Sequence, residues 1–465
     1  MSIRLPDGVL PPPGRRALPP VPALRALLGP GIILAGLSIG SGEFVLWPRL
    51  TAQFGFAIFW AAWIGVTIQF FLNMEIERYT LATGESAVVG FLRLSRVFGP
   101  VFLLCGTLPW IWPGWATGAG TLLSWQIGGD PVVYAVAGLV LCGAVLSLGP
   151  VIYRTVEILQ ITLVSLIFAG LIYLFARLVT VDALLALGEG AIHIGHVPDG
   201  IELPLLLGAL AFAGAGGTVN LAQSNYIRDK GYGMGIWVGR LTSPFTGREE
   251  AASDTGFVFD VNEESLPVWN LWWRRANIEH AISFYLLCVL SLALLCVITW
   301  SLLEPGAPVG EGFGFIREQA NALSTRFGPG AEWTFLCAGI AVLVSTELAL
   351  LDAVTRVVAD VVHASLLRDS PRWTLSRLYI AILWGFIAFG VAVLLVGLDQ
   401  PLTLLVLSSS LNAGVMFLYS GLLLWLNASS FSGPLRPSPA RMAALVVALL
   451  FYGYFSALTL ADQFG

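Results

Sequence analysis

The first apolar stretch of the chain reads Gly29-Pro-Gly-Ile-Ile-Leu-Ala-Gly-Leu-Ser-Ile-Gly-Ser-Gly-Glu43. It predicts a membrane span that carries a Gly-Ser-Gly break and a carboxylate near its middle. A bilayer tolerates irregular backbone only where protein buries it or where it lines a cavity. An ionisable side chain at that depth costs at least about 2.5–3.5 kcal/mol, so Glu43 is a candidate functional residue. Helices broken beside a charge are typical of ion and substrate sites in transporters.

The composition is that of an integral membrane protein. Of the 465 residues, 57% are hydrophobic and 11% are charged, and the mean hydropathy is +0.81. Soluble domains contain about 25% charged residues. The five cysteines all fall inside apolar runs, which favours a packing role over disulfides or a zinc site. Residues 1–25 are rich in proline and arginine and lack the apolar core of a signal peptide, so we expect a disordered cytoplasmic tail.

The length of the apolar runs predicts an all-α protein, because a spanning helix needs about 20 apolar residues. We place eleven spans at roughly 28–51, 54–76, 98–124, 131–149, 155–177, 203–226, 280–303, 333–358, 376–397, 402–427 and 440–461. With the N-terminus inside, all but four of the 24 Lys and Arg residues fall on the cytoplasmic side; the four are Arg49, Arg177, Arg317 and Arg326. The positive-inside rule then predicts a cytoplasmic N-terminus and an external C-terminus in the cell (plasma or inner) membrane.

The sixth predicted span, like the first, has glycines at its middle: Gly214, Gly216 and Gly217. Glycine costs a helix interior about 1 kcal/mol relative to alanine, so these positions are weak points. Interrupted spans at corresponding places in two halves predict an inverted repeat. Close helix packing through small residues is the alternative interpretation. We predict that both spans are unwound, near 40–42 and 214–218, and that the two breaks face each other.

A single transmembrane domain over 26–465 follows from this repeat. The first repeat covers about 28–177 and the second about 203–427, with an extra helix at about 440–461. The polar segment 227–279 contains the cluster Trp269-Asn-Leu-Trp-Trp-Arg-Arg275, which suits an element at the level of the cytoplasmic lipid headgroups. A regulatory role for this segment stays open.

Three short motifs carry a family resemblance. The pattern G-P-x-x-x-x-A-x-x-x-x-D-P-G-N aligns without a gap on residues 29–43. The pattern R-L-G-x-x-T-G is similar to Arg78-Tyr-Thr-Leu-Ala-Thr-Gly84, and M-P-H-N-L is similar to Gly217-Thr-Val-Asn-Leu221. Over about 28–90 and 205–226 the chain therefore resembles the Nramp family of divalent metal transporters. This resemblance implies the LeuT-type fold, in which spans 1, 2, 6 and 7 rock as a bundle against a scaffold of spans 3, 4, 8 and 9.

The metal ligands of the Nramp family are replaced in this chain. Its Asp position holds Gly40, its Asn position holds Glu43, and its Met position holds Gly217. A thioether selects softer ions, so its loss favours a hard cation or another substrate. The proton relay of the family is also missing, because its histidine position holds Val219 and span 98–124 has no carboxylate. We therefore expect a divergent member that lacks the Nramp proton relay.

The candidate cation site is built from oxygen donors. We expect Glu43 to be the anionic ligand, and we expect the site to include Gly40, Gly214, Gly217, Asn220, Ser224 and Ser409. Glu43 and Asn220 are the predicted metal ligands. Oxygen donors of this kind suit magnesium, calcium, manganese or sodium. The alternative is that Glu43 only caps the second half of a broken helix, where the helix dipole stabilises negative charge.

A second candidate cation site lies in the eighth span. In LeuT-type transporters this span contributes hydroxyls to a sodium site facing the first span, and the resemblance implies that role for Ser345, Thr346 and Glu347. Asp352, Arg356 and Asp360 follow at four-residue spacing, which predicts a self-paired stripe near the inner membrane surface.

The sequence predicts a secondary transporter or facilitator that moves a cation, first of all a divalent metal ion, by alternating access. A sodium-coupled solute transporter and a membrane receptor without transport stay open as alternatives. An enzyme is disfavoured, because no histidine is predicted at bilayer depth to serve as a base and no H-E-x-x-H motif exists. We expect the lipid bilayer and the transported cation as partners, no cofactor and no nucleic acid; the oligomeric state is open.

Overall fold

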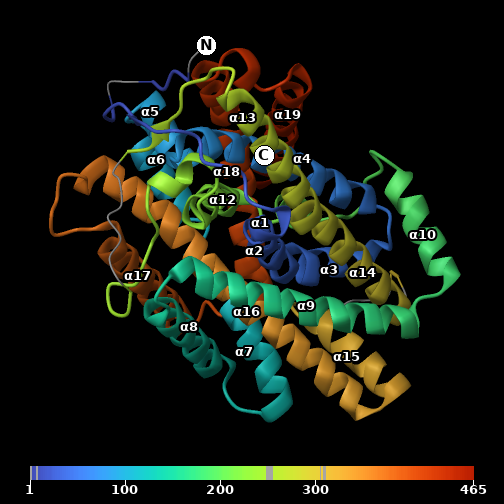
Figure 1. Ribbon diagram of the computed structural model, residues 1–465. Helices are drawn as coiled ribbons and strands as arrows, with labels where there is room; N and C mark the ends of the chain where they lie inside the picture. Colours follow the sequence, from blue (N-terminus) through green and yellow to red (C-terminus); the bar gives the residue numbers. More distant parts are fainter. Residues whose placement is uncertain (1–2, 7–8, 248–254, 304, 307–309, 465) are drawn as a thin grey trace.

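The computed structural model describes residues 3–6, 9–247, 255–303, 305–306 and 310–464 (Figure 1). Two sequence predictions, the tail over 1–25 and the loop over 227–279, therefore lie partly outside the described residues.

The described chain is mainly helical, with one small two-stranded sheet. The α-helices are α1 (Leu24–Leu27), α2 (Pro30–Ser38), α3 (Trp47–Phe54), α4 (Phe59–Thr83), α5 (Ala87–Leu94), α6 (Phe98–Thr107), α7 (Gly114–Ile127), α8 (Pro131–Leu148), α9 (Ile152–Leu178), α10 (Val181–Ile192), α11 (Leu203–Ala211), α12 (Gly217–Lys230), α13 (Ser265–His280), α14 (Leu287–Leu302), α15 (Gly314–Phe327), α16 (Pro329–Val362), α17 (Leu375–Leu395), α18 (Pro401–Ser430) and α19 (Pro439–Phe464). Segments with other helical pitch are η1 (Ile39–Leu46), η2 (Gly233–Trp237), η3 (Ala281–Leu286), η4 (His363–Leu367) and η5 (Gly433–Leu435), and the strands are β1 (Gly14–Arg15) and β2 (Phe257–Val258).

Within the described residues, nine continuous helices are long and apolar enough to cross a membrane. They correspond to the predicted spans other than the third and the sixth. Those two spans are each divided into two shorter helices, α6 with α7 and α11 with α12. The all-α membrane architecture is thus confirmed, while the count of eleven spans stays a prediction.

The predicted break in the sixth span is present. Helix α11 ends at Ala211 and α12 begins at Gly217, and the residues between them are not helical. The backbone turns through Gly216 and Gly217, whose φ angles are 73° and 55°. An L-residue with a side chain rarely adopts this left-handed region, whereas glycine enters it freely.

The predicted unwinding of the first span near residues 40–42 is wrong. The span runs without interruption from α2 through η1 into α3, and η1 is a π-helix. Its backbone amides bond five residues back, as Trp47 N–H does to the Gly42 carbonyl. A π segment keeps the backbone hydrogen-bonded in lipid and is frequent at functional sites. The glycines here permit close packing, the alternative interpretation of the sequence, rather than a break.

An interruption that the sequence analysis did not predict divides the third span. Helix α6 ends at Thr107 and α7 begins at Gly114, with Pro109 and Pro113 between them. Proline has no N–H and its ring clashes with the preceding turn, so two prolines four residues apart end one helix before the next begins. Trp110 lies in this gap and reaches the sixth span, as described below.

The N-terminal tail packs on the end of the molecule that is predicted to be cytoplasmic. Strand β1 pairs in parallel with β2, with Gly14 opposite Phe257. Trp272 Nε1 on α13 donates a 2.8 Å hydrogen bond to the Pro19 carbonyl. The described part of residues 1–25 therefore forms specific contacts, instead of the disordered tail that the sequence predicts. Likewise, the end of the predicted loop 227–279 is helical, because α13 covers residues 265–279 of this loop and continues through η3 into α14.

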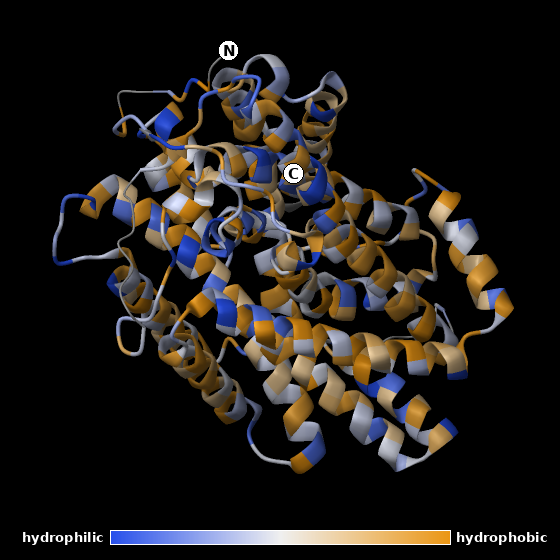
Figure 2. Cartoon of the chain, viewed as in Figure 1, coloured by the Kyte–Doolittle hydropathy of each residue, from blue (hydrophilic) through white to orange (hydrophobic). Residues whose placement is uncertain are grey.

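The long helix α16 is the central packing element. It contacts α2, α7, α8, α9 and α12. Figure 1 shows α2 and α12 near the middle of the molecule, with α10 and α15 at the right and lower right, far from α5 at the upper left. In Figure 2 the outer helices are mostly hydrophobic, while hydrophilic segments gather around α12 in the interior. The molecule thus has an apolar exterior and a polar centre, as expected for a protein surrounded by lipid that encloses a polar site.

Substituting Gly42 tests the close contact between the first and sixth spans. A Cβ at Gly42 would lie 1.7 Å from the Phe212 carbonyl oxygen. We expect Gly42→Ala to destabilise the protein by about 1–3 kcal/mol, the usual cost of overpacking. The control is Gly138→Ala in α8, where nothing lies within 4 Å of the added atom. Thermal unfolding in detergent should give a lower midpoint for Gly42→Ala only; equal midpoints would contradict the contact.

Candidate functional site

Glu43 lies on η1 and is completely buried. Ser38 Oγ donates a 2.5 Å hydrogen bond to Glu43 Oε1, and Ser291 Oγ on α14 donates to Oε2. The thiol of Cys288, one turn before Ser291, lies within hydrogen-bonding reach of Ser38 and Glu43. No basic side chain among the described residues forms an ion pair with Glu43. A buried carboxylate without a positive partner is costly, so this arrangement is suited to receive a cation or a proton.

The π segment faces the break of the sixth span. Gly42 packs against the Phe212 carbonyl, which lies in the break. One turn later, Trp47 Nε1 donates a 3.0 Å hydrogen bond to the Ala209 carbonyl at the end of α11. The backbone of η1 at Gly42, one residue before Glu43, therefore lies against the break of the sixth span, while the Glu43 carboxylate faces α14.

Gln69 on α4 stabilises the break, a role that the sequence analysis missed. Its Nε2 donates to the Ala211 carbonyl at 2.8 Å, and its Oε1 accepts from Gly216 N–H at 3.1 Å. One amide thus replaces two of the hydrogen bonds that the interrupted helix cannot make. The sequence feature that could have indicated this role is a glutamine within an apolar span. An amide side chain is costly in lipid unless it has hydrogen-bond partners.

The amide nitrogen of Asn220 bonds to side chains of α4 and α18. Asn220 Nδ2 donates to Gln69 Oε1 at 3.3 Å and to Tyr419 Oη at 3.0 Å. Glu43 instead faces α14 through Ser291, and no hydrogen bond between described atoms joins it to Asn220. The oxygen of the same amide, Asn220 Oδ1, has no hydrogen-bond partner among the described residues, so the metal pair Glu43 and Asn220 stays a prediction.

Four further predicted site residues contact their own or neighbouring helices. Ser224 Oγ donates to the Leu221 carbonyl of its own helix, and Ser409 Oγ donates to the Val406 carbonyl at 3.0 Å. Gly217 packs against the Asn412 side chain of α18. Gly214, in turn, packs against the amide of Gln69. These residues shape the surroundings of the break, but none of these contacts reaches Glu43.

The predicted second cation site is not assembled from the eighth span. Thr346 Oγ1 faces the first span, where it donates to the Gly36 carbonyl at 3.3 Å and packs against Gly40. Ser345 Oγ bonds back to the Val342 carbonyl at 3.0 Å. Glu347 lies on the side of α7, where it accepts a hydrogen bond from the Ala116 amide. Neighbouring positions on a helix point in different directions, so of these three only Thr346 faces the first span.

Aromatic side chains connect the breaks of the third and sixth spans. Trp110 stacks on Trp115 and on Phe212, with centroid distances of 6.0 and 5.9 Å. Trp110 Nε1 also donates a 2.6 Å hydrogen bond to Thr218 Oγ1 at the start of α12. The interrupted third span therefore fixes one side of the break that faces Glu43.

Ion pairs join α12 to α16 beyond the break. Arg228 pairs with Asp360 at 3.2 Å, and Asp229 pairs with Arg356 at 2.6 Å. Arg356 also pairs with Asp352 at 2.9 Å, as the four-residue spacing predicts. The predicted pairing of Arg356 with Asp360 is not present among the described ion pairs. Asp360 instead finds its partner on α12, because the stripe faces that helix rather than lipid.

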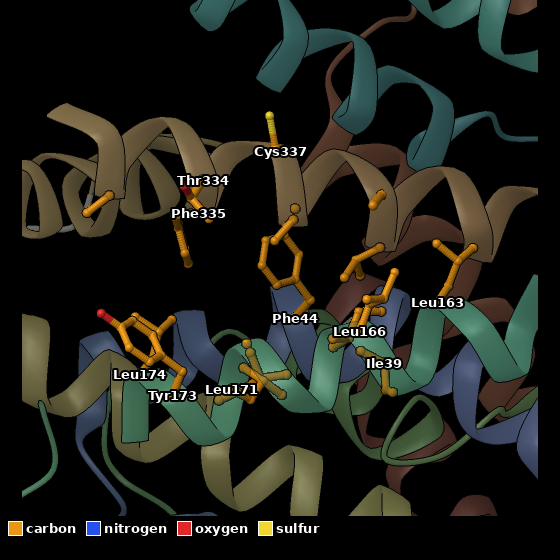
Figure 3. A pocket seen from close by; sticks show the side chains of 18 of the residues that line it. Ile39, Phe44, Leu163, Leu166, Leu171, Tyr173, Leu174, Thr334, Phe335 and Cys337 are labelled. Atoms are coloured by element: carbon orange, nitrogen blue, oxygen red, sulfur yellow. The ribbon is translucent and has the colours of Figure 1, made fainter. Parts of the chain in front are cut away.

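An apolar cavity of about 680 Å³ lies beside η1, between α9 and α16. Figure 3 shows Leu166 and Leu171 of α9 opposite Thr334 and Phe335 of α16, with Phe44 of η1 between the two helices. The lining has almost no polar atoms, so the cavity is not a cation site. The cavity leaves free space on one side of Phe44, the residue that follows Glu43.

Comparison with protein-family models and with curated protein sequences finds no match. Among solved structures, a variant of the Eremococcus coleocola manganese transporter aligns with TM-score 0.70 and 14% identity over 97% of this chain and 90% of that one. The same transporter with an aromatic bis-isothiourea substituted compound gives TM-score 0.67, 14% identity, and 97% and 91% coverage. Mhp1, a nucleobase-cation-symport-1 family transporter, gives TM-score 0.55, 13% identity, and 94% and 93% coverage. The expected LeuT-type fold is confirmed, and these structural neighbours are transporters.

Removing the Gln69 amide tests its role at the break. Gln69→Leu leaves the Ala211 carbonyl and the Gly216 amide without these partners, and each such buried group costs about 1–3 kcal/mol. We expect a lower unfolding midpoint and faster amide hydrogen exchange over residues 211–217, measured by mass spectrometry. The control is Gln126→Leu, which removes an exposed bond to the Trp333 carbonyl. Unchanged exchange over 211–217 would show that another group holds the break.

Proposed function

We propose that the chain is a secondary transporter or facilitator that binds a cation at Glu43 and moves it across the membrane by alternating access. The observation that carries the proposal is the complete burial of Glu43 without a basic partner, on the segment that faces the break of the sixth span. The fold shared with transporters supports it.

The donors around Glu43 favour a divalent metal ion as the substrate. The carboxylate and the hydroxyls of Ser38 and Ser291 supply oxygen atoms, which suit Mn²⁺, Mg²⁺ or Ca²⁺. Cys288 adds one softer sulfur atom beside them. This sulfur comes from the seventh span rather than from the sixth, and it favours a transition metal such as Mn²⁺ over Mg²⁺.

We infer that ion pairs between α12 and α16 close the site on its cytoplasmic side. On one side, Arg228 and Asp229 of α12 are paired with Asp360 and Arg356 of α16. Helix α12 belongs to the moving bundle and α16 to the scaffold, if the parts move as the family resemblance implies. Opening towards the predicted cytoplasmic end would then separate these pairs, and closing would re-form them. Such a two-state interface is what alternating access requires.

A sodium-coupled solute transporter is the second candidate function. Thr346 Oγ1 of the eighth span lies against the Gly36 carbonyl of the first span. A hydroxyl from the eighth span and a carbonyl from the first are the donors that the sodium site of this fold type would use. This contact keeps sodium coupling as a specific alternative to direct metal transport.

Removing the charge of Glu43 tests the main proposal. We expect Glu43→Gln to lower Mn²⁺ affinity about 10- to 100-fold, since a charged interaction contributes about 1.5–3 kcal/mol. Calorimetric titrations with Mn²⁺, Mg²⁺ and Ca²⁺ on purified protein measure it. The matched control is Glu189→Gln at an exposed position of α10. Unchanged affinity of Glu43→Gln for all three ions would reject the proposal and favour the sodium-coupled alternative.

The second test concerns proton coupling. The Nramp relay position in the sixth span holds Val219, and the third span offers no carboxylate. We expect cation uptake into proteoliposomes without acidification of the lumen, followed with a pH-sensitive dye beside a metal-sensitive dye. A proton flux that rises in step with cation flux would show that another acid carries the proton.

A further inference from the structure

A buried polar seam lies between α4 and α12. On α4 it consists of Gln69, Asn73 and Glu77, which share one helical face at four-residue spacing. On α12 it consists of Asn220 and Gln223. Two hydrogen bonds cross the seam: Asn220 Nδ2 donates to Gln69 Oε1 at 3.3 Å, and Gln223 Nε2 donates to Glu77 Oε2 at 3.2 Å. All five side chains are at most 1% exposed.

His280 of α13 closes one end of the seam. Its Nδ1 lies 3.4 Å from Gln223 Nε2, and its ring stacks between Phe70 and Phe284 at 5.8 and 4.7 Å. Because Gln223 donates to Nδ1, we assign the proton of the neutral ring to Nε2. The amide of Gln223 therefore joins a carboxylate to an imidazole.

The seam contains several buried polar atoms without a hydrogen-bond partner. They are Asn73 Nδ2 and Oδ1, Glu77 Oε1, Asn220 Oδ1, Gln223 Oε1 and His280 Nε2. Buried polar atoms are normally satisfied by protein, water or an ion. Four of these atoms are oxygens that can accept or coordinate, and they lie on two facing helices. These oxygens need partners that the described residues do not supply.

The charge balance around the seam is negative. Glu75 is paired with Arg78 at 2.8 Å and with Arg441 at 3.5 Å. Glu77 has no ion pair with any described residue, and neither has Glu279, which accepts from Ser283 Oγ at 2.8 Å. Two buried acids therefore lack a positive partner here, and a cation would compensate them.

We propose that the seam is a second cation-binding station for the transported metal, with Glu77 Oε1, Asn73 Oδ1 and Gln223 Oε1 as ligands. Carboxylate and amide oxygens are the donors that hard divalent cations take, and His280 Nε2–H can hold a water molecule of the hydrated ion. The proposal rests on the proposed function, because it extends the route of the same substrate. Glu77 lies two turns beyond Gln69, about 12 Å along α4, towards the predicted cytoplasmic end.

Counting bound Mn²⁺ tests this station. Electron paramagnetic resonance measures free Mn²⁺ in titrations of the full-length protein in detergent. We expect two bound ions in the wild type, one in Glu43→Gln, one in Glu77→Gln and none in the double variant. Glu189→Gln, an exposed acid, is the matched control and should keep both ions.

A variant that adds a negative charge distinguishes the loss of the cation site from the loss of the folded structure. Asn73→Asp adds a carboxylate to the seam, so it should strengthen Mn²⁺ binding in the Glu43→Gln background at least tenfold. If neither Glu77→Gln nor Asn73→Asp changes the Mn²⁺ bound by Glu43→Gln, the seam holds water only and the proposal is overturned. If Glu43→Gln keeps two ions while Glu77→Gln loses one, the seam site stands and the assignment of Glu43 fails.

Discussion

The backbone of the sixth span is the constraint on which the interior depends. Where α11 stops, its carbonyl and amide groups lie deep inside an apolar molecule, and each needs a partner. Gln69 supplies both partners from a neighbouring helix, and this fixes how α4 lies against α12. The polar seam along α4 continues from that contact, one helical turn at a time. A single amide therefore links the break to the polar residues beyond it.

Three irregular segments meet around this amide. The π segment of the first span approaches the break at Gly42, and the gap in the third span approaches it through Trp110. The backbone of each segment is hydrogen-bonded in a different way. The π segment bonds within a wider helix, the break bonds to Gln69, and in the gap of the third span the amides of Trp110 and Ile111 bond to the Thr107 carbonyl. Glu43, one residue after Gly42, is buried beside this meeting point with its carboxylate turned to Ser291 of α14.

The sequence was sufficient for the fold and for part of the site. Apolar length and arginine distribution predict the spans, and the glycines of the sixth span predict its break. The glycines at 40 and 42 led to the wrong prediction of a second break, because glycine also permits close helix contacts. Thr346 packs against Gly40, and Phe212 packs against Gly42. Partners across helices, such as Ser291 for Glu43 and Gln69 for Ala211, depend on which faces meet. No periodicity within one span contains that information, so the sequence assigned Glu347 to the first span, whereas it accepts a hydrogen bond from the Ala116 amide of α7.

The π-helical segment of the first span would let this span change its conformation without losing its backbone hydrogen bonds. A π-helix holds one more residue in its ring than an α-helix, and that residue can pass along the chain as hydrogen bonds exchange partners. Each such step would rotate the residue that the turn passes by about 100° around the helix axis, while the helices on either side keep their relative orientation. Glu43 lies within this π-helical segment. A one-residue shift of the hydrogen bonds at Glu43 would therefore turn its carboxylate to a different face of the helix. Phe44 would move with it, into the open space between α9 and α16.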